Sequence, residues 1–406
     1  MTPKLRFPKF SGEWEPRKLG DLDIYVSDGN YGEMYPKTSE MKDSGVAFIR
    51  ANNLKDGKLT WQDMRYIDLD LHKVLKSGHL KTGDTLVTTR GDVGITAYVT
   101  EEFDNANINA QICLLRTGDD LAKQYLFYSL QTAKSKNQFT QLQTGSALKQ
   151  LPKGKLALLV IGVPSKDEQE KIAGFLTVVD ERVAAMSKKV ELLQRYKKDV
   201  MQKIFSQKLR FKDEDGQNYS DWQGKKLGDL VIEIADGGTP DTSNKEYFGG
   251  SINWVVIDDI QDVIERTKTT LSEKGLQGSS AKLWPKGTVI LSTGATIGEV
   301  GIAKVAVATK QGIVGIDLNK SLADNRYIKF WLQRHRATLL RYAQGSSIKE
   351  IRAPELKKLK IITPGLKEQQ KIADFLTSLD DKINLEKIKL DQAKLFKKSL
   401  LQRMFV

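Results

Sequence analysis

Paired acidic residues are the groups in this sequence that could hold a metal ion for nuclease chemistry. Pro240-Asp241 matches the beginning of a metal-nuclease motif, but no Glu-x-Lys follows at a workable distance, so an ordinary turn is favoured. Asp258-Asp259 could bind a metal ion through its carboxylates. In an internal repeat of the chain the matching residues are Asn52-Asn53, which could not carry that charge. A loop or capping role is therefore favoured, and we predict no metal site.

Other catalytic groups are equally sparse. The chain has three histidines, too scattered to form a triad, and its single cysteine, Cys113, is better suited to packing in an apolar strand. The Gly-Lys pairs that begin at Gly57, Gly154 and Gly224 are followed by Leu, Leu and Lys, so none is a phosphate-binding P-loop. No Gly-rich dinucleotide or adenosylmethionine loop follows an expected strand, and the chain lacks the Pro-Pro that an amino-methyltransferase loop requires. The sequence thus predicts a non-catalytic protein without a cofactor.

Polar loops punctuated by glycine could instead contact the edges of DNA bases. Arg and Lys read guanine and Asn and Gln read adenine, because these side chains bond to base edges in the major groove. In the first half of the chain the candidate DNA-binding residues are Asn30, Tyr31, Lys37, Arg50, Asn52, Asn53, Arg90, Asn107, Asn109, Gln111, Ser146 and Lys149. In the second half they are Thr239, Ser243, Asn244, Lys245, Thr293, Thr296, Lys310, Gln311, Ser346, Ser347 and Lys349. For any one of them, a turn or surface role is the competing interpretation.

The charge balance agrees with a polyanionic partner. The 406 residues include 64 Lys and Arg against 51 Asp and Glu, a net charge of +13. Such an excess favours nucleic acid or an anionic membrane surface. The longest apolar run, residues 156–163, is far shorter than the roughly 20 residues of a membrane-spanning helix, and no signal peptide is recognisable. We expect a cytoplasmic protein that binds double-stranded DNA and no membrane.

An internal duplication organises the chain. KLRF at residues 4–7 recurs at 208–211, and the segments that begin at Pro164 and Pro364 match at a constant offset of 200 residues (364 minus 164). A unit of about 200 residues is therefore present twice. Between the matching landmarks the loops differ, which suggests two related domains that read different targets.

Each unit begins with an α+β domain. Short β-branched segments bounded by Gly and Asp predict strands over 85–89, 96–99 and 112–116, and over 288–293, 301–307 and 313–318. One amphipathic helix is expected to follow in each copy, over 121–139 and 325–342.

Each unit ends in a long helix. Ser165 and Glu168 predict a capping box at the start of the first one. Apolar residues then alternate at spacings of three and four, the period of a coiled-coil seam. The seam residues are Ile172, Leu176, Val179, Val183, Met186, Val190 and Leu193, with Ile372, Leu376, Leu379, Ile383, Leu390 and Leu400 in the second copy. We expect the two helices to bury their stripes against each other in antiparallel orientation; the alternative is that each packs only on its own domain.

The position of the two KLRF segments predicts that the two ends of the chain lie close together. This segment follows the first helix, but the second helix stops at Val406, and the other copy of KLRF stands at residues 4–7. The N-terminal segment is therefore expected to take the place of a continuation of the C-terminal helix, which brings the termini close together.

These repeated segments resemble the specificity (S) subunit of type I restriction-modification systems. The resemblance spans essentially the whole chain and rests on the paired Trp…KLGDL openings, the paired Gly-Ser-x-x-Lys segments at 145–149 and 345–349, and the paired Pro…EQ-x-KIA-x-FL helices. It implies two target-recognition domains, each reading one half of a split DNA site. It also implies an antiparallel pair of helices that sets the gap and docks two methyltransferase subunits. Methylation and cleavage would belong to those partners and to restriction and translocase subunits.

The predicted architecture is α+β, with two homologous mixed α/β target-recognition domains separated by two long helices, and pseudo-twofold symmetric. The expected divisions are 1–163 for the first domain (with 1–13 adjoining the C-terminal helix), 164–211 for the central helix, 212–363 for the second domain and 364–406 for the C-terminal helix. The alternative function is a non-catalytic coiled-coil adaptor for an acidic protein partner.

Overall fold

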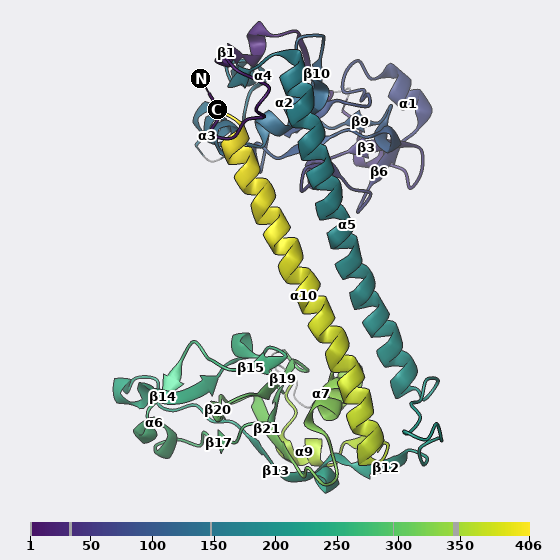
Figure 1. Ribbon diagram of the computed structural model, residues 1–406, viewed down its shortest axis with the longest axis vertical. Helices are drawn as coiled ribbons and strands as arrows, with labels where there is room; N and C mark the ends of the chain where they lie inside the picture. Colours follow the sequence, from purple (N-terminus) through teal and green to yellow (C-terminus); the bar gives the residue numbers. More distant parts are fainter. Residues whose placement is uncertain (1, 32–34, 147, 295, 344–348) are drawn as a thin grey trace. The chain divides into compact units, whose positions relative to one another are not determined.

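The computed structural model describes residues 2–31, 35–146, 148–294, 296–343 and 349–406. The chain divides into two compact units: the first joins Met1–Lys188 to Ile388–Val406, and the second is Lys189–Lys387 (Figure 1). Each unit holds one domain of mixed sheet and helix together with a part of both long helices, α5 (Lys166–Phe205) and α10 (Leu366–Met404). The α+β class predicted from the sequence is confirmed.

The domain of the first unit is built on two main sheets. One has the strand order β2-β10-β7-β8, and the other the order β6-β3-β9. The strands are β1 (Glu15–Lys18), β2 (Ile24–Asp28), β3 (Val46–Ile49), β4 (Leu54–Lys55), β5 (Lys58–Leu59), β6 (Arg65–Ile67), β7 (Thr85–Thr88), β8 (Thr96–Tyr98), β9 (Asn107–Ile108), β10 (Ile112–Thr117) and β11 (Val160–Val163). The helices are α1 (Leu69–Val74), α2 (Lys123–Leu130), α3 (Ala133–Leu142) and α4 (Lys153–Leu156).

The domain of the second unit also has two main sheets, and each has one strand more than its counterpart in the first unit. Their strand orders are β13-β21-β18-β19-β15 and β16-β14-β20-β17. The strands are β12 (Gln223–Lys226), β13 (Val231–Asp236), β14 (Phe248–Val255), β15 (Val263–Ile264), β16 (Thr270–Leu271), β17 (Leu283–Trp284), β18 (Val289–Ser292), β19 (Val300–Ala303), β20 (Val307–Thr309), β21 (Ile313–Leu318) and β22 (Lys360–Thr363). The helices are α6 (Glu273–Gln277), α7 (Asn325–Arg334), α8 (Arg336–Tyr342) and α9 (Ala353–Lys357).

Three expectations about these elements need correction. The single helix predicted over 121–139 is two helices, because the hydroxyl of Thr132 accepts a hydrogen bond from the Ser135 amide and caps a new helix, α3. The helix predicted over 325–342 likewise breaks at His335, between α7 and α8. The strand predicted over 301–307 is also divided, into β19 and β20, which pair in different sheets.

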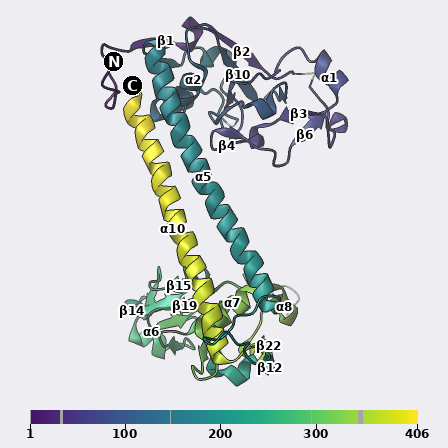
Figure 2. The ribbon, with the colours of Figure 1, turned by 45° about the vertical axis from the view of Figure 1, so that its right-hand side comes forward.

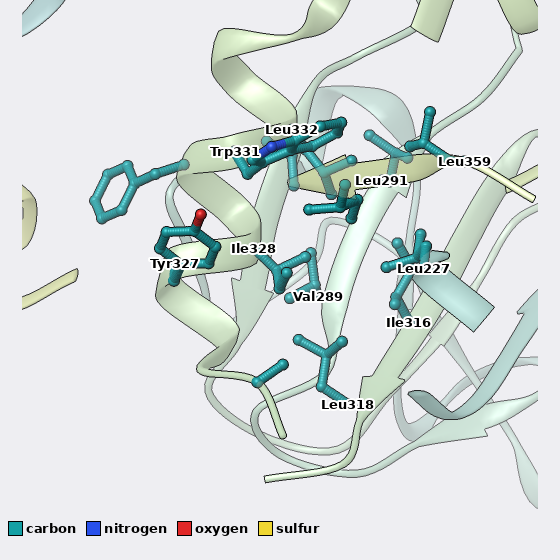
Figure 3. Close-up of a cluster of buried hydrophobic side chains, with 14 of the residues drawn as sticks. Leu227, Val289, Leu291, Ile316, Leu318, Tyr327, Ile328, Trp331, Leu332 and Leu359 are labelled. Atoms are coloured by element: carbon teal, nitrogen blue, oxygen red, sulfur yellow. The ribbon is translucent and has the colours of Figure 1, made fainter. Parts of the chain in front are cut away.

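The central strands are buried on both faces, which explains their continuous apolar sequences. In β10, Cys113 and Leu115 face one hydrophobic cluster, while Ile112 and Leu114 face another. In the second domain Val289 and Leu291 of β18 lie under α7 in the same way; Figure 3 shows them beside the side chains of that helix. Each domain thus has its own core on both sides of its main sheet.

Within each unit, segments of the two long helices run antiparallel (Figure 2). In the first unit Ile172 and Leu176 of α5 pack in one cluster with Leu400 and Met404 of α10, and Lys397 Nζ lies 2.6 Å from Asp180 Oδ1. Residue numbers thus increase along α5 in the direction in which they decrease along α10.

The second unit repeats these contacts at matching residues. Val200 and Ile204 pack with Ile372 and Leu376, and Lys197 forms an ion pair with Asp380. The other seam residues named from the sequence are buried or half-buried: Val179, Val183, Met186, Val190, Leu193, Leu379, Ile383, Leu390 and Leu400.

The expectation for the chain ends is confirmed. The Leu5 amide donates to the Arg403 carbonyl at 2.8 Å, just as the Leu209 amide donates to the Lys203 carbonyl at 3.1 Å. The N-terminal segment therefore stands against α10 as residues 208–211 stand against α5, and the two termini lie together (Figure 1).

An ion pair between a partly exposed arginine and a buried glutamate holds each KLRF segment to the start of a long helix. Arg6 donates through Nε and Nη2 to the two carboxylate oxygens of Glu168, both at 2.7 Å. Arg210 makes the matching pair with Glu368, at 3.2 and 2.8 Å. The Glu168 amide donates to the carbonyl of Ser165 and not to its hydroxyl, and the Glu168 carboxylate accepts from Arg6, so the predicted capping box with Ser165 is wrong. In both copies this glutamate instead joins the KLRF segment to the long helix.

Candidate DNA-recognition surface

Three strand ends bring predicted site residues together at one edge of the first domain. Cys113 pairs with Asp28 and Ile112 with Thr88, so the end of β2, the end of β7 and the start of β10 lie side by side. Arg90 and Gln111 lie within two residues of these ends, and Tyr31 follows β2 by three residues. The structure therefore brings Tyr31, Arg90 and Gln111 to one place.

The second sheet adds to the same edge. Strands β3 and β9 are parallel, so their carboxyl ends meet, and the Asn109 amide donates to the Ile49 carbonyl at 2.9 Å. Arg50 follows directly after Ile49. A hairpin closed by Thr144 and Gln150 also reaches this edge, because Gln150 bridges to Arg90. We call the exposed or half-buried side chains here the first rim: Tyr31, Arg50, Asn52, Arg90, Gln111, Ser146 and Lys149.

Four of the predicted asparagines are buried behind this rim and hold its loops. Asn30 receives a hydrogen bond from the Lys76 amide and donates to the Ser77 carbonyl. Asn53, fully buried in the 3-10 helix η4 (Ala51–Asn53), caps it by accepting from the Arg50 amide at 3.0 Å. Asn107 donates to Ser77, and Asn109 accepts from the Gln111 amide. Because these side chains are hydrogen-bonded to the backbone, we do not propose that they contact DNA bases.

The same edge of the second domain is assembled by the same backbone bonds. The Lys310 amide donates to the Val255 carbonyl at 3.0 Å, as Asn109 does to Ile49. The Thr293 amide donates to Gly312 at 2.8 Å, as Thr89 does to Gln111 at 2.7 Å. We call the exposed or half-buried side chains here the second rim: Thr239, Thr296, Lys310, Gln311 and Lys349. Thr293 is fully buried, and Ser346 and Ser347 lie outside the described residues.

Some predicted residues lie elsewhere. Ser243, Asn244 and Lys245 precede β14 and thus lie at the end of that strand opposite Val255; Asn244 caps the 3-10 helix η7 (Lys245–Tyr247). Lys37 stands before the 3-10 helix η3 (Thr38–Glu40), ahead of β3 and away from Ile49. The strand pairings do not bring these four to the rims.

Matched backbone bonds show which side chains differ at equivalent places. Arg50 corresponds to Val256, Arg90 to Gly294, Asn109 to Lys310 and Gln111 to Gly312. The backbone frame is thus repeated while the side chains attached to it change in charge and size. One more cation was missed from the sequence: Lys153, whose Nζ lies 3.8 Å from Asp28 Oδ1. It stands four residues after Lys149, the last residue of a repeated segment, which could have drawn attention to it.

Two acidic side chains near the second rim accept hydrogen bonds from backbone amides and so stabilise the fold. Asp259 accepts from the Val256 and Lys268 amides at 3.1 and 3.2 Å, the role that Asn53 has in the first domain, so the predicted capping role is confirmed. Asp236 accepts from the Ala353 amide, and burial raises the pKa of its carboxyl. Within the described residues no three His, Cys, Asp or Glu side chains gather where they could hold a metal ion.

The family model for the type I restriction modification DNA specificity domain matches the chain twice, over residues 11–195 and 219–395. The chain belongs to this family. Each of the two DNA specificity domains carries one rim, and the specificity subunit is the DNA-recognition component of a type I restriction-modification system, not its catalytic subunit. Such subunits act on DNA together with the other subunits of the complex.

Two relatives, one matched over nearly the full length and one over less than half, agree with this assignment. The chain is 25% identical over 420 residues to the type I restriction enzyme MjaVIII specificity subunit of Methanocaldococcus jannaschii, with 98% of this chain and 92% of the relative covered. It is 35% identical over 189 residues to the MjaIX specificity subunit of the same organism, covering 45% of this chain and 44% of that protein.

The fold of this specificity subunit is also known from solved structures. The crystal structure of the S subunit of a type I restriction-modification system from M. genitalium superimposes with a TM-score of 0.63 at 16% identity, covering 100% of this chain and 99% of that one. In the described part of the chain, none of the helices combines the length and apolar character of a membrane span.

Proposed function

We propose that the two rims read the two halves of one asymmetric, split DNA site. The observation that carries this proposal is the difference between the rims: the same backbone bonds present Arg50 and Arg90 in the first domain but Val256 and Gly294 in the second. Base edges are distinguished by the donors and acceptors that face them, so different side chains on one frame suit different sequences. The divisions 1–163 and 212–363 are the two recognition domains in this proposal.

The two long helices act as the spacer in this proposal. A helix of 40 residues such as α5 is about 60 Å long at 1.5 Å per residue, longer than one turn of the DNA duplex. Base pairs between the two half-sites would then go unread.

The same helices offer docking sites for two methyltransferase subunits. Tyr196 and Phe396 stand at matching positions of the repeat and are 50% and 56% exposed, as are the neighbouring Leu192 and Leu395 at 51% and 65%. Exposed aromatic and aliphatic side chains of this kind are typical of protein interfaces. Two exposed aromatic side chains at matching positions suit two copies of one partner, through which restriction and translocase subunits would join the complex.

Selection from random DNA tests the proposed function. The specificity subunit, reconstituted with its methyltransferase partners, is expected to enrich two short blocks separated by an unread spacer, as sequencing of the bound fraction would show. Absence of any enriched sequence contradicts the proposal and favours a coiled-coil adaptor for an acidic partner protein.

An exchange of loops predicts a change in one block only. When residues 29–115 are replaced by those of another member of the family, the first half-site is expected to change and the second to stay, because the second rim is untouched. The same selection measures this result. A change in both blocks would show that the domains do not read independently.

A heptad insertion predicts a change in the spacer alone. Seven residues inserted after Lys188 and seven after Lys387 preserve the seam because they add two nearly complete turns. They lengthen each helix by about 10 Å, which corresponds to at most about three base pairs. Selection is expected to return unchanged blocks with a longer spacer. Altered blocks, or an unchanged spacer, would contradict the spacer role.

A further inference from the structure

Arg90 and Tyr31 form a cation–π pair on the first rim. The guanidinium carbon of Arg90 lies 5.1 Å from the centre of the Tyr31 ring. Both side chains are exposed, and no acidic side chain of the described residues is within ion-pairing distance of Arg90. A guanidinium beside an aromatic ring loses part of its rotational freedom but keeps its N–H donors available.

The Tyr31 side chain is itself held in place by hydrogen bonds of its hydroxyl group. Its hydroxyl lies 2.9 Å from Asp28 Oδ2 and 3.1 Å from the Ala110 carbonyl oxygen, and it can donate to these acceptors. Partial burial and the Asp28 carboxylate raise the pKa of Tyr31 to about 12, which keeps the phenol protonated as a donor at neutral pH. Asp28 and Ala110 flank the pairing of β2 with β10, so the ring is attached to the sheet.

We propose that Arg90 reads a guanine in the half-site of the first domain and that Tyr31 is the positioning residue for its guanidinium. This inference rests on the proposed function. Arginine bonds in bidentate fashion to O6 and N7 of guanine in the major groove, and a guanidinium held by an aromatic ring forms these two bonds at a smaller entropic cost.

The described residues at the two equivalent positions of the second domain cannot form such a pair. Thr293 makes the backbone bond that Thr89 makes, so the residue equivalent to Arg90 is Gly294; the residue three after Asp236, the counterpart of Asp28, is Thr239. The Arg90–Tyr31 arrangement is therefore specific to the first domain. A contact of Arg90 with a DNA phosphate is the competing interpretation, because most protein–DNA bonds go to phosphates and carry no sequence information.

Three substitutions separate these two roles in the reconstituted complex. Arg90→Ala is expected to lower the preference for guanine at one position of the first block by about 5- to 150-fold, with the second block unchanged. Arg90→Lys keeps the charge but not the bidentate geometry, so it is expected to lose part of that preference with the same salt dependence of binding. Tyr31→Phe keeps the ring and removes its hydroxyl anchor, and is expected to weaken the guanine preference less than Arg90→Ala.

The measurements are selection with sequencing, and binding of matched and single-mismatch duplexes over a range of salt concentrations. Lys310→Ala removes one positive charge from the second rim instead of the first, so as a control it should leave the first block intact. Uniform weakening of all sequences by Arg90→Ala, with a salt slope reduced by about one, would assign a phosphate contact and overturn the inference. Unchanged selection by Arg90→Ala overturns it as well, while the wild-type split site still supports the proposed function. A wild-type complex that selects no split site overturns both.

Discussion

Arg210→Ala is expected to lower the free energy of unfolding of the second unit by about 3–5 kcal/mol. The substitution leaves the Glu368 carboxylate fully buried with only the Trp222 indole N–H, at 3.2 Å, as a side-chain donor. Removal of one partner of a buried ion pair is strongly destabilising because the remaining charge stays desolvated. Arg210 also donates to the Ser220 carbonyl at 2.6 Å, so the segment that leads into the domain loses an anchor too.

Hydrogen exchange resolved by peptide measures this effect, because it reports the opening of each unit separately in a chain with two units. The double variant Arg210→Ala with Glu368→Gln is expected to be less destabilised than Arg210→Ala alone, since it removes the buried charge as well. Arg6→Ala is the matched variant in the first unit, where Glu168 is 2% exposed. If Arg210→Ala were as stable as the wild type, this ion pair would not stabilise the second unit.

Gly237→Ala is expected to weaken recognition by the second rim by about 5- to 150-fold while the first block is still selected. A Cβ at this position would lie 2.3 Å from the Lys310 carbonyl oxygen and 2.4 Å from that of Thr309. Both atoms belong to the backbone that carries the rim, so the loop must move, at a cost of about 1–3 kcal/mol. Gly29→Ala makes the mirror test in the first domain, where a Cβ would lie 2.4 Å from the Ile108 carbonyl oxygen.

Gly224→Ala in β12 is the control for both glycine variants. No atom lies within 4 Å of a Cβ at Gly224, so this variant should be as stable as the wild type or slightly more stable. Selection with sequencing shows which block is lost, and hydrogen exchange shows whether the loss is local. If the Gly237→Ala variant still selected both sequence blocks, the close contact of Gly237 with the backbone of Thr309 and Lys310 would not be needed for recognition by the second rim.

Much of the organisation of this protein was determined by the sequence itself. The duplication, the two long helices with their seams and the KLRF segment that stands in for a continued helix are all readable from repeated or periodic residues. These features depend on local spacing, which survives without knowledge of distant contacts. The family resemblance rests on the same repeated residues and is confirmed over both halves of the chain.

The recognition surface was decided by the tertiary structure. Asn53, Asn109 and Arg90 look alike in sequence as polar loop residues, but the first two are buried and bonded to the backbone while Arg90 is exposed beside Tyr31. Glu168 looks like a capping residue, yet its partner is Arg6, 162 positions away. Burial and long-range pairing arise when strands from distant parts of the chain meet, and local composition carries no record of which side chain then faces inward.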